Sequence, residues 1–192
     1  MSPDRYDLVI IGGGSAGLTG AAFAAKIGAR VAIVEKHRIG GDCTWTGCVP
    51  SKALLKAGKI AHEVRRAESF GVEVSAPRVD MARVRDYVRG AVAQVYSSET
   101  PAQLKERGIE VIEAAAELTD AHTIRAGERV LSAGRIVLAT GARPSIPPIP
   151  GLAEVPYVTY EKIFDNDVLP VHLVVLGAGP IGLEMAQAYR RL

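Results

Sequence analysis

Residues 6–17 read YDLVIIGGGSAG, an apolar run that leads into three glycines. The run is typical of a buried strand, and Gly12, Gly14 and Gly17 fit the pattern G-x-G-x-x-G. In that pattern the first glycine permits a tight turn, the second lets the backbone approach a pyrophosphate, and the third lets the next helix pack on the strand. The stretch therefore predicts a helix over residues 15–27, with a nucleotide site at its amino terminus.

An acidic residue follows at the expected place. Residues 30–34 are typical of a second strand, and Glu35 stands at its end, about 20 residues past the motif, where an acid hydrogen-bonds ribose hydroxyls. A strand, a helix and a strand in this order predict a parallel sheet with a right-handed crossover. The motif alone does not distinguish FAD from NAD.

The composition is that of a soluble globular protein. The chain has 192 residues, of which 48% are hydrophobic and 23% charged, enough for one domain or one and a fraction. A net charge of +2 gives no reason to expect nucleic acid or a membrane as a partner. Residues 8–25 carry no charge, but their glycines break a helix and acidic residues precede them, so we expect a cytoplasmic protein.

The rest of the chain reads as alternating helices and strands. Thr100 is a helix cap, followed by Pro101 at the first helical position and by Gly108 at the end. Residues 40–50 are expected to be an irregular loop, and the proline-rich residues 143–150 a stiff linker at a domain boundary. Further helices are predicted over 51–69 and 80–98, and strands over 109–112, 123–125, 129–132 and 135–139.

The opening pattern returns after the linker. A strand is predicted around Leu173, and Gly177, Gly179 and Gly182 repeat the first glycine motif before a second helix. Two such motifs suggest two nucleotides. Because the chain stops at Leu192, we interpret it as the amino-terminal piece of a longer enzyme, the alternative being a naturally short chain.

Two cysteines lie five positions apart. In a regular helix the Cα atoms of Cys43 and Cys48 would be about 8–9 Å apart, and a disulfide needs less than about 7 Å. Gly47 and Pro50 make a distortion plausible, and a helix that begins beside Cys48 would favour its thiolate. A zinc site lacks further ligands at the usual spacing. An inert thiol pair and a redox disulfide remain open.

Four signatures together resemble the pyridine nucleotide-disulfide oxidoreductases, the family of glutathione reductase, dihydrolipoamide dehydrogenase and mercuric reductase. They are the first glycine motif, the stretch GGDCTWTGCVPSK at 40–52, Ala139-Thr140-Gly141, and the second glycine motif. The resemblance implies an α/β fold. Residues 1–150 would be a Rossmann-like FAD-binding domain with a parallel sheet, a small antiparallel element and the redox cysteines. Residues 151–192 would be a linker and the start of a second Rossmann-like domain that binds NAD(P).

The resemblance also implies roles. Electrons would pass from NAD(P)H through FAD to the Cys43–Cys48 disulfide, with Cys48 as the charge-transfer thiolate and Cys43 as the interchange thiol. Lys52 would pair with Glu184 beside the flavin, as a half-buried and therefore costly ion pair to break. The residues implied to contact FAD are Gly12, Gly14, Ser15, Ala16, Gly17, Glu35, Lys36, Gly41, Asp42, Ala116, Ala139, Thr140 and Gly141, and those for NAD(P)H are Gly177, Gly179 and Gly182.

The chain departs from the family pattern at a few positions. Asp42 stands where many members have threonine, and Trp45-Thr46 where many have Asn-Val. This variant resembles mercuric reductase-like chains, so a small disulfide or a thiol-bound metal is the expected substrate of a homodimer. A dihydrolipoamide dehydrogenase is the runner-up, and a non-catalytic FAD-binding redox module is the rival from another class. We expect residues 1–192 alone not to turn over a disulfide substrate efficiently.

Overall fold

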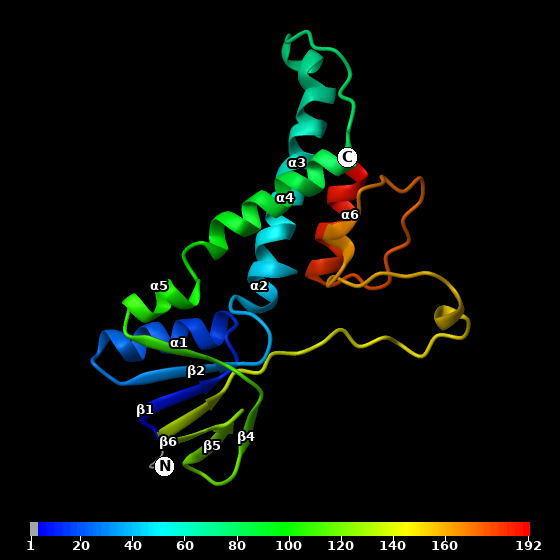
Figure 1. The fold of residues 1–192 in the computed structure, drawn as a ribbon. Helices are drawn as coiled ribbons and strands as arrows, with labels where there is room; N and C mark the ends of the chain where they lie inside the picture. The colour runs from blue at the N-terminus through cyan, green and yellow to red at the C-terminus, as the bar shows by residue number, and fades with distance from the viewer. Residues whose placement is uncertain (1–3) are drawn as a thin grey trace. The chain divides into compact units, whose positions relative to one another are not determined.

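The computed structural model describes residues 4–192 and has an α/β fold built on one mixed sheet (Figure 1). The six strands lie in the order β3-β2-β1-β6-β5-β4, and β1, β2, β3 and β6 form the parallel part. β5 and β4 add an antiparallel edge. The strands are β1 Asp4–Ile11, β2 Val31–Glu35, β3 Ile109–Glu113, β4 Ala116–Leu118, β5 Thr123–Ala126 and β6 Arg129–Leu138.

Alternate side chains of the central strands enter two different cores, as the pleat of a strand requires. Ile10 of β1 packs in one core with α1 (Ser15–Lys26) and with Leu104 of α5 (Pro101–Glu106). Its neighbour Val9 packs in the other core, which includes Ile124 of β5. Both faces of the parallel sheet are thus covered, which explains the continuous apolar run of β1.

The chain divides into two compact units. The first holds the sheet and consists of the described residues up to Trp45 together with Val95–Arg143. The second consists of Thr46–Gln94 and Pro144–Leu192. The helical segments not yet named are α2 Gly41–Trp45, α3 Cys48–Arg66, η1 Ala67–Phe70, α4 Met81–Tyr96, η2 Leu152–Glu154, η3 Ile163–Asp165 and α6 Pro180–Arg191.

The core of the second unit lies where α3 and α6 pack together. Leu54 of α3 and Met185 and Ala188 of α6 are buried in one cluster with Ile163. Gly58 permits the close approach, because a β-carbon there would stand 2.9 Å from the carbonyl oxygen of Ala188. None of the helices in the described part of the chain is both long and apolar enough to cross a membrane.

The capping prediction for α5 is confirmed. The Thr100 side chain accepts a hydrogen bond from the Gln103 N–H at 3.3 Å, with Pro101 at the first position of the helix. Gly108 follows the end of α5 with a φ of 80°.

Two sequence predictions about local structure are wrong, and one strand is missed. The predicted loop at 40–50 contains the short helix α2 and the start of α3 at Cys48. The two strands expected over 129–132 and 135–139 are one continuous strand, β6, because Gly134 stays in the ladder beside Asp7 and makes no turn. The short strand β4 was not predicted at all; its residues gain a partner only through β5.

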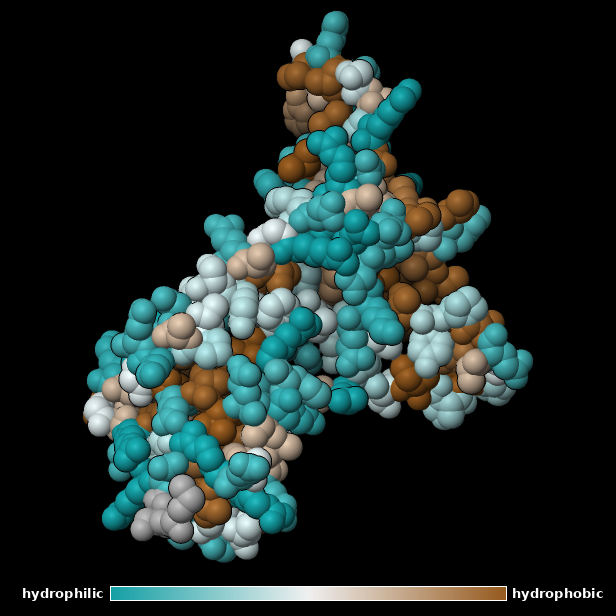
Figure 2. All heavy atoms as spheres, viewed as in Figure 1, coloured by the Kyte–Doolittle hydropathy of each residue, from teal (hydrophilic) through white to brown (hydrophobic). Residues whose placement is uncertain are grey.

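The strand predicted around Leu173 is also absent. Residues 171–178 are assigned neither helix nor strand, although the following helix, α6, forms as predicted. A strand needs neighbouring strands for its backbone hydrogen bonds, and every strand pairing among the described residues belongs to the first unit's sheet. Figure 2 shows hydrophobic side chains on the surface of the molecule; those of Val171, Val174 and Leu176 are 92%, 82% and 61% exposed.

Candidate nucleotide and dithiol site

The first glycine turn lies at the carboxyl ends of β1 and β6. Gly12 has a φ of +112°, and a β-carbon there would stand 2.1 Å from the carbonyl oxygen of Ala139. The N–H of Ala139 donates to the carbonyl of Ile11 at 2.8 Å, which brings the end of β6 against the turn. The structure therefore brings Ala139, predicted from a separate signature, to the edge of the sheet where ligands bind in this class of fold.

The amino terminus of α1 is open to an anionic ligand. Its first residue follows Gly14, which makes no side-chain cap, and no acidic residue lies in the first turn. Ser15 and Ala16 are exposed residues, and the first N–H groups of a helix have no partner within the helix. Unpaired N–H groups and the helix dipole at such a terminus favour a phosphate.

Glu35 has a role in the turn that sequence reasoning missed. Its carboxylate accepts the N–H of Gly13 at 2.7 Å and the N–H of His37 at 2.8 Å. The acid therefore holds the glycine turn in place. An ionised carboxylate has about four acceptor positions, so these two bonds do not use up its capacity, and the ribose contact stays a prediction.

Another glycine contact joins the turn to the cysteine segment. A β-carbon on Gly41 would stand 2.6 Å from the α-carbon of Gly14, so the two backbones meet directly. Asp42 follows in the exposed first turn of α2. The Ala114 N–H donates to the Glu35 carbonyl at 3.0 Å. Ala116 begins β4 and pairs with Ala126 of β5, so its contact to FAD stays a prediction. Bare backbone, open N–H groups and an acid are the features that a dinucleotide requires, so these residues fit FAD.

Three other predicted residues, Lys36, Thr140 and Gly141, are exposed at the ends of their strands. No contact assigns them a specific role, and their contacts to FAD stay predictions.

The second glycine turn repeats the local geometry of the first. Gly177 has a φ of +108°, and Gly179 precedes α6 without a side-chain cap. A β-carbon on Gly182 would stand 2.3 Å from the carbonyl oxygen of Gly177. The NAD(P) contacts of these three glycines stay predictions.

The two cysteines do not share a helix. Cys43 lies in α2 and is half-buried, whereas Cys48 is the exposed first residue of α3. The chain between the helices passes through Gly47, whose φ of −129° and ψ of −111° are not helical. The two cysteines are therefore not on one regular helix, and a disulfide between them stays a prediction. Cys48 also stands at the amino terminus of α3, whose first turn has no acidic residue.

Contacts beside Cys43 were not predicted from the sequence. Thr44 is 3% exposed, and its hydroxyl donates to the Glu99 carboxylate at 2.8 Å. Trp45 donates its indole N–H to the carbonyl of Ile39 at 2.7 Å. The sequence marks this region as unusual, because Trp45-Thr46 replaces the common Asn-Val. That difference does not identify the residues that Thr44 and Trp45 contact.

Lys52 and Glu184 form an ion pair between α3 and α6. The hydrogen bond from Lys52 lowers the pKa of Glu184, against a smaller opposing effect of burial. The Lys52 side chain is 63% exposed and that of Glu184 32%. The pair is therefore less buried than expected, and removal of one partner should change the free energy of unfolding little.

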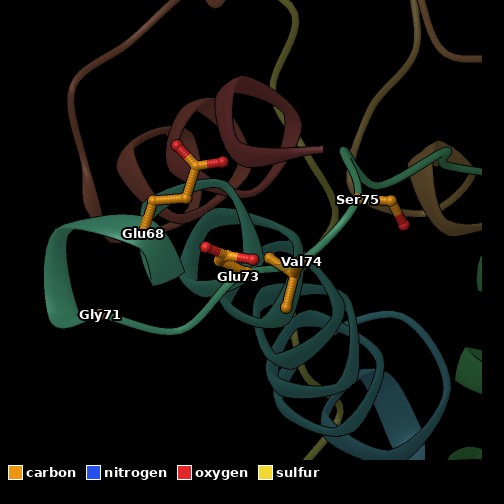
Figure 3. Close-up of a pocket in the computed structure, with 5 residues that line it drawn as sticks. All are labelled: Glu68, Gly71, Glu73, Val74 and Ser75. Carbon is orange, nitrogen blue, oxygen red and sulfur yellow. The ribbon is translucent and has the colours of Figure 1, made fainter.

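Two hollows on the surface include none of the glycines of the two turns in their lining. One has a volume of about 680 Å³ and follows the carboxyl end of α3, lined by Glu68, Gly71, Glu73, Val74 and Ser75 (Figure 3). Another, of about 910 Å³, lies beside His62 and Arg65 of α3 and Tyr189 of α6. Within residues 4–192, no group of three or more His, Cys, Asp or Glu side chains could hold a metal ion.

Comparison with known proteins agrees with these features. The model of the pyridine nucleotide-disulphide oxidoreductase family matches residues 6–192. Mercuric reductases from Lysinibacillus sphaericus and Bacillus cereus are 36% and 34% identical over 100% and 97% of this chain. One from Staphylococcus aureus is 35% identical over 97% of the chain. The chain spans only 35%, 30% and 34% of the lengths of these three relatives. It belongs to the pyridine nucleotide-disulphide oxidoreductase family.

Proposed function

We propose that the protein is an FAD- and NAD(P)H-dependent oxidoreductase that reduces a thiol-bound metal or a small disulfide. The observation that carries the proposal is the contact between Gly41 and Gly14. It brings the cysteine segment onto the predicted nucleotide turn, with Cys43 only two residues beyond Gly41. A nucleotide turn alone would suit a plain dehydrogenase, which has no use for the cysteines.

The first unit would supply the residues for FAD. The N–H groups at the start of α1 would bind the pyrophosphate, and Glu35 would accept ribose hydroxyls while it holds Gly13. The Gly177 turn would hold NAD(P)H in the same manner. When bound, FAD supplies two-electron transfer from the nicotinamide to a disulfide.

The two cysteines have different environments and therefore different proposed tasks. Reduction of the Cys43–Cys48 disulfide adds two electrons and breaks the S–S bond, and solvent protonates any sulfur that becomes a thiol. Cys48, at the amino terminus of α3, would keep the thiolate. Cys43 would then attack the substrate. With a disulfide it would break the S–S bond, form a mixed disulfide and release the other sulfur as a thiol; with a metal it would replace the original thiol ligand.

The metal substrate is proposed from the relatives, which are named mercuric reductases. The soft thiolates of the cysteine pair suit a soft metal ion. The domain boundary near residue 150 and the homodimer remain proposals that limited proteolysis and light scattering would test.

The test is anaerobic addition of NADH or NADPH to the flavin-loaded protein, followed by a mercuric thiolate, oxidised lipoamide or glutathione disulfide. We expect the 450 nm flavin absorbance to bleach and then to recover fastest with the mercuric thiolate. Cys43→Ser should still bleach but should not pass electrons on. Recovery with lipoamide alone would reassign the substrate, and absence of bleaching would reduce the protein to a non-catalytic FAD-binding module.

A further inference from the structure

Helix α2, which carries Cys43, is too short to be stable without contacts to other parts of the protein. It has five residues, Gly41–Trp45, and an isolated helix of that length is not stable in water. Its conformation must therefore come from contacts with the rest of the first unit. The buried hydroxyl of Thr44 makes one of them, a hydrogen bond to Glu99.

Trp45 makes three more contacts. Its indole N–H donates to the Ile39 carbonyl at 2.7 Å, and the Arg38 guanidinium lies 3.9 Å from the centre of its ring. The ring of Tyr96 packs against it, tilted by 52°, with the centroids 4.8 Å apart. A guanidinium over an indole is a favourable cation–π contact, and a tilted aromatic pair is a favoured geometry.

The residues that contact Thr44 and Trp45 come from two separate parts of the sequence. Ile39 and Arg38 precede α2, whereas Tyr96 and Glu99 lie more than fifty positions later in the chain. The backbone at Cys43 is therefore fixed against two separate parts of the first unit. These contacts are made by Thr44 and Trp45, so their effect on the chemistry of Cys43 would act through its position.

We propose that Trp45, together with the Thr44–Glu99 hydrogen bond, is a positioning element for the Cys43 thiol in the dithiol–disulfide cycle. This inference rests on the proposed function, because it assumes that Cys43 and Cys48 form the redox disulfide. A fixed Cys43 backbone limits the conformers of the reduced dithiol and raises the effective concentration of one sulfur at the other. The disulfide is thereby favoured, and its reduction potential is lowered.

The test is a redox titration of the full, FAD-loaded protein with reduced and oxidised glutathione. Two glutathione molecules give up two electrons and leave as glutathione disulfide while the Cys43–Cys48 bond breaks. Rapid alkylation and mass mapping then give the equilibrium constant without any measurement of turnover. The variants are Trp45→Ala, Trp45→Phe and Thr44→Val, with Tyr87→Ala on an exposed aromatic of α4 as the matched control.

In Trp45→Ala we expect the equilibrium to shift about tenfold toward the dithiol, which is a potential higher by about 30 mV. Trp45→Phe keeps a ring but loses the indole N–H, and Thr44→Val loses the buried hydroxyl. Each should shift the equilibrium about threefold, and Tyr87→Ala should not shift it. If Trp45→Ala fails to fold, these two milder variants decide the outcome.

Equilibrium constants within twofold of wild type in the folded Trp45 and Thr44 variants would overturn the inference and leave the proposed function intact. A wild-type protein that forms no Cys43–Cys48 disulfide at any glutathione ratio would instead overturn both.

Discussion

The two glycine motifs share a turn but differ in what surrounds them. Gly12 and Gly177 have φ values of +112° and +108°, and a helix without a side-chain cap follows each turn. The preceding strand β1 is buried in a sheet, with Val9 and Ile10 fully buried, whereas residues 171–178 form no strand and are exposed. The turn is thus encoded locally, while the strand depends on neighbours elsewhere in the chain.

Hydrogen exchange should show the largest difference between the two motifs. In the 192-residue chain, the amides of Val9 and Ile10 should exchange only on global unfolding, thousands of times more slowly than unprotected amides. The amides of Val174 and Val175 should exchange within about tenfold of the unprotected rate, because no ladder protects them. Comparable protection of both segments, read by mass spectrometry, would refute the distinction.

Matched alanine substitutions should separate the two turns in stability. Each would be strained by a positive φ, which costs about 1–3 kcal/mol. Gly12→Ala should cost clearly more than that, because its β-carbon would also clash with Ala139, whereas a β-carbon at Gly177 would meet no atom within 4 Å. The free energy of unfolding in urea measures the difference, and equal losses would contradict the structure.

The far end of β1 is tied to its neighbours by a polar network. The Tyr6 hydroxyl donates to Glu110 at 2.7 Å, and Arg129 donates to Glu110 at 2.9 Å. Burial opposes the charged Glu110, but the hydrogen bonds from Tyr6 and Arg129 outweigh it and lower its pKa. Burial and the hydrogen bond to Glu110 raise the pKa of Tyr6.

The two shifts define a pH window for this network. The Glu110 contribution is present above its unfolded pKa, near 4.5, and is lost as pH falls through the lower folded value. The Tyr6 contribution is present below its unfolded pKa, near 10, and is lost as pH rises through the higher folded value. Tyr6→Phe should therefore destabilise the protein by about 1 kcal/mol between these limits, and by less outside them. Urea denaturation of wild type and Tyr6→Phe at several pH values tests this prediction. A difference in the free energy of unfolding that does not change with pH would contradict it.

The helix of the second motif, α6, is joined to α3 by a weaker polar contact, the Lys52–Glu184 ion pair. Because Lys52 is 63% exposed, Glu184→Gln should cost less than about 1 kcal/mol. Its lowered pKa means that this small stabilisation is present above pH 4.5 and lost as pH falls through the folded value. Lys59→Gln, in the exposed pair with Glu63, is the control. A loss of several kcal/mol in Glu184→Gln alone would show that the pair is buried after all.

Local signals explain which features could be predicted. The apolar run of β1, the glycine turn and the Thr100 cap each depend on residues close in sequence, and each formed as expected. Long-range partners explain the failures. β4 requires β5, and the strand expected at Leu173 has no partner strand among residues 4–192.

At the candidate site too, local features could be predicted and long-range contacts could not. The glycines and cysteines could be named from their pattern. The contact of Gly41 with Gly14, the bond from Gly13 to Glu35 and the partners of Trp45 depend on tertiary packing that no motif encodes.

The central claim is that the first glycine turn and the cysteine segment form one flavin–dithiol site. The most direct test is the visible spectrum of the FAD-loaded protein after reduction by two electrons. We predict a new long-wavelength band that Cys48→Ser abolishes and Cys43→Ser retains. Retained flavin without that band, or a band that survives Cys48→Ser, would contradict the claim.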